Sequence, residues 1–144
     1  MDRPATAGSI ARGIGVLALL VAAAGCASSR FDPVALEQDR ALKARALSLM
    51  EKGTEDIGGY TGAIDSLTAD IHTAVLYESG QKENNASLKE WSTVMDPSKN
   101  LLQDFLHRWQ MERRLNESYV KEAKQRVGDV FDRIIELENE KQAK

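Results

Sequence analysis

The two histidines, His72 and His107, are the side chains in this sequence most suited to holding a metal ion. Asp70 lies two residues before His72, and residues at that spacing face different sides of a helix. Asp104 and His107 are three residues apart and share a helix face, which is the local spacing of carboxylate–histidine metal sites. A site between helices also needs inward ligands from other helices, and no second pair of this kind supplies them. We therefore expect no metal site.

The sequence also lacks the motifs of nucleophilic and phosphate chemistry. No serine stands in a G-x-S-x-G turn, and Gly58-Gly59 is not followed by the lysine and threonine of a phosphate-binding loop. Three carboxylates near the C-terminus form an apparent cluster, which we interpret as a solvated helix end: Glu136, Glu138 and Glu140. We expect a protein that is not an enzyme and has no cofactor.

Cys26 is the single cysteine in the 144 residues. It follows Arg3, Arg12 and an uncharged run over residues 13–24, which together have the basic start, apolar stretch and small-residue end of a secretory signal. The run is too short for a membrane span, which needs about 20 apolar residues. A lone cysteine in an exported protein has no partner within the chain, and acylation would remove the reactive thiol.

Residues Ala23-Ala24-Gly25-Cys26 resemble the lipobox of bacterial lipoproteins, in which small residues precede the cysteine. The family prefers leucine where this chain has Ala23. The resemblance covers the first 26 residues. It implies cleavage between Gly25 and Cys26, attachment of a diacylglycerol to the thiol, and acylation of the new amine. Each buried methylene contributes about 0.8 kcal/mol, so two or three acyl chains form a durable anchor. The first expected partner is thus the membrane, through the lipid on Cys26.

The residue after the cysteine bears on which membrane holds the anchor. In this chain that residue is Ala27. An aspartate at this position would resemble the signal that retains Gram-negative lipoproteins in the inner membrane, and the chain does not have it. We expect the outer membrane, with the chain facing the periplasm. In a Gram-positive host the same anchor would place the chain on the outer face of the cell membrane.

The mature chain, which begins at Cys26, is acidic overall. The full sequence has 19 Lys and Arg against 22 Asp and Glu, and removing Arg3, Arg12 and Asp2 with the signal leaves a net charge of −4. A nucleic-acid-binding protein would show a concentrated basic face, so we expect no nucleic-acid partner. The expected organisation is a signal peptide at 1–25, an acylated tether at 26–31 and a helical bundle domain at 32–144.

Helix signals recur along the mature chain. Asp32-Pro33 predicts the start of a first helix, because aspartate is a favoured N-cap and proline suits the first helical position. Gly53 predicts its end. A second helix is expected to begin at Thr54, or nearer Tyr60 because glycines disfavour the intervening turn, and to end at Gly80.

The remaining sequence predicts further helices and no strands. A short helix is expected over 87–94, Asp96-Pro97 repeats the opening signal of the first helix, and a break is expected near 113–116. The last helix carries an apolar stripe at alternating steps of three and four residues: Val120, Ala123, Val127, Val130, Ile134 and Leu137. We predict an all-α fold, a small antiparallel bundle of three to four helices.

Two apolar groups have more than one interpretation. Trp91, Phe105 and Trp109 would normally pack in a core, and the alternative is a partly exposed aromatic groove that binds a partner. The last helix has the same ambiguity. Its stripe forms either the bundle core or a coiled-coil seam to a second copy of the chain, through Val120, Val127 and Ile134.

These features predict a lipid-anchored cell-envelope protein that binds another envelope protein as an adaptor and carries out no catalysis. One alternative is a structural lipoprotein that self-associates through its last helix. Another is a helical carrier of a small apolar ligand, which an unfilled cavity behind Phe105 and Trp109 would support.

Overall fold

A computed structural model describes residues 31–81 and 84–143, and these residues form helices and no strands. The predicted all-α class is confirmed, with five α-helices in these ranges where three to four were expected. The predicted signal peptide, Gly25, Cys26 and most of the predicted tether lie outside the described residues. The helices are α1 (Pro33–Met50), α2 (Thr61–Ser79), α3 (Asn85–Val94), α4 (Leu102–Glu112) and α5 (Glu117–Gln142), with short 3-10 helices η1 (Glu51–Thr54) and η2 (Ile57–Gly59) between α1 and α2.

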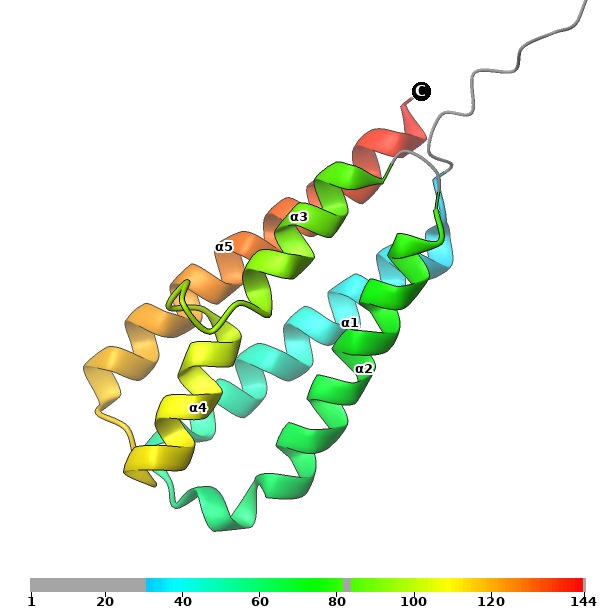
Figure 1. The fold of residues 1–144 in the computed structure, drawn as a ribbon. Coiled ribbons are helices and arrows are strands. Elements are labelled where there is room, and N and C mark those ends of the chain that lie inside the picture. The colour runs from blue at the N-terminus through cyan, green and yellow to red at the C-terminus, as the bar shows by residue number, and fades with distance from the viewer. Residues whose placement is uncertain (1–30, 82–83, 144) are drawn as a thin grey trace, which may run out of the picture.

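The longest helix, α5, packs against α1 and α3, and α1 in turn packs against α2. Figure 1 shows α1 and α2 running in opposite directions, with α3 and α4 following one another along α5. The start of α1, the end of α2, the start of α3 and the end of α5 meet at one end, which we call the upper end (Figure 1). None of the described helices is both long enough and apolar enough to cross a membrane.

The start of α1 follows the sequence prediction. The Asp32 carboxylate accepts hydrogen bonds from the N–H groups of Val34 at 2.9 Å and Ala35 at 3.4 Å, which confirms the N-cap. These bonds satisfy donors that the first helical turn otherwise leaves unpaired. The helix ends at Met50, and the chain then tightens into η1.

Gly53 has a different role from the helix-ending one that we predicted. It lies within η1, and no described glycine has the positive φ of a left-handed helix cap. A Cβ at this position would lie 2.7 Å from Phe105 Cζ and 3.0 Å from Val120 Cγ2. The Gly53 carbonyl also accepts a hydrogen bond of 2.7 Å from the Leu115 N–H. Glycine is needed here because α4 and α5 approach the backbone too closely for a side chain.

Gly53→Ala is expected to lower the free energy of unfolding by about 1–3 kcal/mol, the usual cost of overpacking a core. Denaturant unfolding followed by far-UV circular dichroism measures the loss. Gly62→Ala is the matched control, since nothing lies within 4 Å of a Cβ at Gly62. Alanine also favours helix over glycine, so this control should be neutral or slightly stabilising. Equal losses in the two variants would contradict the packing explanation.

The middle of the chain differs from the prediction at one helix start. The beginning of α2 at Thr61 agrees with the later of the two expected starts, and α3 covers the expected short helix. Asp96-Pro97 does not open a helix, however. The Asp96 carboxylate instead accepts hydrogen bonds from the N–H of Ser98 at 2.8 Å and from its hydroxyl at 2.7 Å, which forms a turn. The next helix, α4, begins only at Leu102.

The predicted break between the last two helices is confirmed. Arg113 has a φ of 64° and ends α4 in the left-handed conformation. The Asn116 side chain then accepts hydrogen bonds from the N–H groups of Ser118 at 2.8 Å and Tyr119 at 3.4 Å, and so caps the start of α5. The Arg113 guanidinium pairs with Asp56 at 2.8 Å, which ties this turn to the segment before η2.

The second half of α5 presents a different face from the expected one. Phe131 and Glu138 are buried, whereas Val130 and Leu137 are only half-buried. The predicted stripe repeats every seven residues, and seven residues fall about 20° short of two full turns of a straight α-helix. In the second half of α5 the buried positions therefore lie one residue further along the chain than predicted. The first half and one later position match the prediction, with burial of Val120, Ala123, Val127 and Ile134.

Candidate functional site

The three aromatic residues singled out in the sequence lie in the core. Trp91, Phe105 and Trp109 each have an exposed fraction of 0%. The Trp91 ring meets the Phe131 ring edge-on at 5.5 Å between centroids, and Phe105 meets Trp109 in the same manner at 6.1 Å. They therefore follow the core interpretation and expose no surface for the partner contact that was the alternative.

The stripe proposed for self-association is also internal. The exposed fractions of Val120, Val127 and Ile134 are 5%, 0% and 1%. They belong to the hydrophobic core that α5 forms with the other helices. In the described chain these side chains hold the helices of one molecule together, which is the first of the two interpretations.

The two histidines come together in space although the sequence treats them separately. His72 on α2 and His107 on α4 line one shallow groove, with Asp65 and Gln103 beside them. Asp104 is not part of that lining, because its carboxylate accepts a hydrogen bond of 3.2 Å from the Tyr119 hydroxyl. The local pairing of Asp104 with His107 is thus replaced by a contact between α4 and α5.

A group of buried carboxylates at the upper end is the most unusual polar feature of the described residues. Asp39 of α1, Glu78 of α2 and Glu138 of α5 have exposed fractions of 2%, 2% and 1%. One carboxylate oxygen from each lies within 4.8 Å of the others. We call these three residues the acidic cluster. Their burial corrects the interpretation of Glu138 as part of a solvated helix end.

Two members of the acidic cluster have polar partners. Glu138 accepts a hydrogen bond of 3.3 Å from the Asp32 N–H and pairs with the Lys141 ammonium. Glu78 lies 3.6 Å from the same ammonium and accepts a hydrogen bond from the Asn84 amide. These contacts join the ends of α2 and α5 to the starts of α1 and α3.

Asp39 is the exception within the acidic cluster. Its Oδ2 atom is fully buried and has no hydrogen-bond partner among the described residues. Burial, with Glu78 and Glu138 adding like charge, raises the pKa of Asp39 from 3.8 to about 7, although the Lys141 ammonium opposes the shift. Burial likewise raises the pKa of Glu78. A buried charged group without a partner normally costs several kcal/mol, so Asp39 is held in an unfavourable state at neutral pH.

The acidic cluster was absent from the sequence prediction, although a signal for it exists. Asp39 is three residues before Leu42 on the apolar face of α1, Glu78 is four residues after Ala74 on α2, and Glu138 is four residues after Ile134 on α5. Each carboxylate thus continues a buried stripe in phase. What the sequence does not show is which stripe ends meet in space, and it is the arrangement of α1, α2 and α5 that brings these three together (Figure 1).

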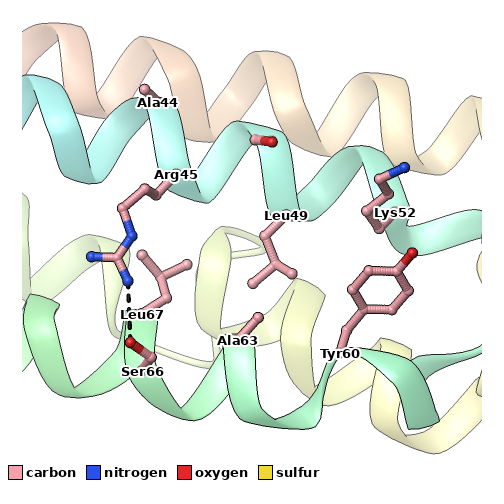
Figure 2. Close-up of a pocket in the computed structure, with 9 residues that line it drawn as sticks. Ala44, Arg45, Leu49, Lys52, Tyr60, Ala63, Ser66 and Leu67 are labelled. Carbon is pink, nitrogen blue, oxygen red and sulfur yellow. Dashed lines mark hydrogen bonds between the residues drawn. The ribbon is translucent and has the colours of Figure 1, made fainter.

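A second candidate site is an open groove of about 660 Å³ between α1 and α2 (Figure 2). Leu49, Ala63 and Leu67 form its apolar floor, and Arg45, Lys52 and Tyr60 stand around it. The Arg45 guanidinium donates a hydrogen bond of 3.3 Å to the Ser66 hydroxyl and pairs with Asp70 at 2.5 Å. The combination of an apolar floor and a rim of paired polar side chains suits contact with a protein segment.

Comparison with known proteins gives no match to a family model, to a curated protein or to a solved structure. The function is therefore inferred from the residues and geometry of this chain alone. Its two strongest features are the acidic cluster at the upper end and the groove between α1 and α2.

Proposed function

We propose that this protein is a lipid-anchored adaptor of the cell envelope, held in the outer membrane by acyl chains on Cys26 and acting through protein–protein contacts without catalysis. The lipobox-like residues Ala23-Ala24-Gly25-Cys26 support the anchor. The predicted tether of residues 26–31 would span at most about 20 Å when extended. The upper end, where α1 begins at Pro33, would therefore stay close to the lipid surface.

The observation that carries this proposal is the distribution of exposed apolar side chains. Three of the four large apolar side chains that are exposed in the described residues lie in the turns of α1 and α2 that form the upper end, with exposed fractions of 71% for Val34, 72% for Leu76 and 44% for Tyr77. The fourth, Met111, is 73% exposed and lies in the last turn of α4. The Tyr77 hydroxyl binds the Asp32 carboxylate beside the first turn of α1. An apolar surface at the point where the tether joins favours contact with a bilayer interface.

The groove between α1 and α2 supports the adaptor role. It runs along the side of the helices, so a partner could reach it while the upper end faces the membrane (Figure 2). Leu49 and Leu67 would take an apolar side chain of the partner. Arg45 and Lys52 already pair with Asp70 and Glu55 of this chain, so they would form a polar rim around that apolar contact. We infer that α1, α2, α5 and the α3–α4 pair act as the predicted antiparallel bundle, which holds this groove rigid.

The two alternatives have less support. Self-association through α5 would need Val120, Val127 and Ile134, which are buried within one chain. A carrier would need space beside Phe105 and Trp109. Those rings contact each other, and even a methyl group at Gly53 would clash with Phe105.

Crosslinking in intact cells followed by mass spectrometry tests the proposal. The acylated protein should capture one abundant envelope protein, and Cys26→Ala should reduce that capture several-fold. Ala63→Arg in the groove should do the same, whereas Ala86→Arg, at an exposed position of α3 outside the groove, should not.

Other outcomes of this experiment point elsewhere. Capture of the chain by itself alone would favour the structural lipoprotein. Mass spectrometry of the bait that finds Cys26 without lipid would overturn the anchor and the location together.

A further inference from the structure

The acidic cluster has more negative charge than the described residues around it neutralise. The three carboxylates come from α1, α2 and α5, and among the residues at 31–81 and 84–143 Lys141 supplies the single ammonium in contact with two of them. Ionised together, these four groups have a net charge of −2. The Lys141 side chain is itself only 8% exposed, so the charge lies inside the molecule. Buried charges of this kind normally coordinate a metal or acquire a further partner.

Asp39 indicates where such a cationic partner would bind. Its side chain is 98% buried because its exposed fraction is 2%, and its Oδ2 atom has no hydrogen-bond partner among the described residues. One of its oxygens nevertheless lies within 4.8 Å of an oxygen from both Glu78 and Glu138. Three carboxylates that face one another, one of them without a hydrogen-bond partner among the described residues, form a set of potential metal ligands.

We propose that Asp39, Glu78 and Glu138 bind one divalent cation of the Ca²⁺ class at the upper end. Ca²⁺ is bound by oxygen ligands at about 2.3–2.6 Å, so two ligand oxygens on opposite sides of the ion are about 5 Å apart or less. The separations in the acidic cluster fit that limit. Carboxylates that project inward from facing helices are also the ligands of metal sites in helical bundles.

The charge of a divalent ion matches the −2 that the three carboxylates and Lys141 carry when all four are ionised. Lys141 lies in the last turn of α5, next to the end of the helix at Gln142, and its ammonium occupies the space between Glu78 and Glu138. Lys141 therefore acts as the resident cation of the free protein and competes with the divalent ion. The bound ion would join α1, α2 and α5 at the end nearest the predicted tether.

Thermal unfolding of the full chain, purified with its lipid in detergent, tests this site. The unfolding midpoint is compared in EDTA and in millimolar CaCl₂, MgCl₂ or MnCl₂. We expect Ca²⁺ to raise the midpoint by several degrees, with one ion bound per chain in titration calorimetry. Asp39→Asn should abolish the shift, and Asp129→Asn, at an exposed position of α5, should retain it.

A Lys141→Met variant provides a second test of the site, because the Lys141 ammonium of the native chain competes with Ca²⁺ for the acidic cluster. Removing the competing charge should tighten Ca²⁺ binding by about tenfold or more. No response to any of the three ions in either the native chain or Lys141→Met would overturn the proposal. A Ca²⁺ shift that survives Asp39→Asn would also overturn it, because the ion would then bind elsewhere.

Discussion

Asp39→Asn is expected to stabilise the protein at about pH 8 in EDTA, by up to about 4 kcal/mol, since each unit of pKa shift corresponds to about 1.4 kcal/mol. The pKa of Asp39 is raised from 3.8 to about 7 by burial and by the neighbouring carboxylates. Ionised Asp39 therefore costs folding energy at alkaline pH. Asparagine has nearly the same shape and no charge to bury, so the cost disappears. Denaturant unfolding followed by tryptophan fluorescence measures the gain.

The pH dependence of stability follows from the same shift. Between about pH 4 and 7 the folded chain retains the Asp39 proton that the unfolded chain has lost, so the free energy of unfolding falls as the pH rises through this window. The decline levels off above about pH 7, and the raised pKa of Glu78 acts in the same direction. The groups that face Asp39 are Glu78 of α2 with Glu138 and Lys141 of α5.

The low-pH side of the profile has the opposite slope. A hydrogen bond from Tyr77 lowers the pKa of Asp32, and one from Lys124 lowers the pKa of Glu51. Such groups contribute stability that is lost as the pH falls through their lowered folded-state values. Stability should therefore be highest near pH 4 to 5. Asp39→Asn should flatten the decline above that maximum, whereas Asp129→Asn should leave it unchanged. A native profile that rises from about pH 5 to 7 would contradict the assigned burial of Asp39.

Local signals explain which parts of the fold could be predicted. The N-cap at Asp32 and the break at Arg113 depend on neighbours within a few residues, and both agree with the sequence prediction. The sequence predicts that Gly53 is a helix boundary, which is correct, but the physical reason is different. Its constraint comes from Phe105 and Val120, which are distant in sequence, and no local pattern shows that approach.

The acidic cluster illustrates the same limit at the candidate site. Polar residues in phase with apolar stripes are visible in the sequence at Asp39, Glu78 and Glu138. A glutamate near a helix terminus is usually solvated, however, so the sequence alone predicts Glu138 at the surface. Only the opposite directions of α1 and α2, with α5 beside α1, bring the three carboxylates to one end (Figure 1).

Trp109→Ala is expected to lower the free energy of unfolding by about 3–5 kcal/mol, the usual cost of removing a large aromatic residue from a core. The Trp109 ring lies 5.5 Å from the Tyr60 ring and 6.1 Å from the Phe105 ring, between centroids. Its indole N–H also donates a hydrogen bond of 3.0 Å to the Glu55 carbonyl. The side chain thus links α4 to the turn between η1 and α2. Denaturant unfolding followed by far-UV circular dichroism avoids reliance on the fluorescence of the missing residue.

A pair of phenylalanine variants separates packing from hydrogen bonding. Trp91 is as deeply buried as Trp109, but its indole N–H has no partner among the described residues. Trp109→Phe should therefore cost about 1 kcal/mol more than Trp91→Phe, the usual net value of one hydrogen bond. The Trp109→Ala variant also tests whether Trp109 serves the core or a partner. If Trp109 were an interface residue, Trp109→Ala would leave the unfolding transition in place and abolish capture of the envelope partner. A core residue instead destabilises the fold with or without a partner present, and the complete burial of Trp109 makes that the expected result.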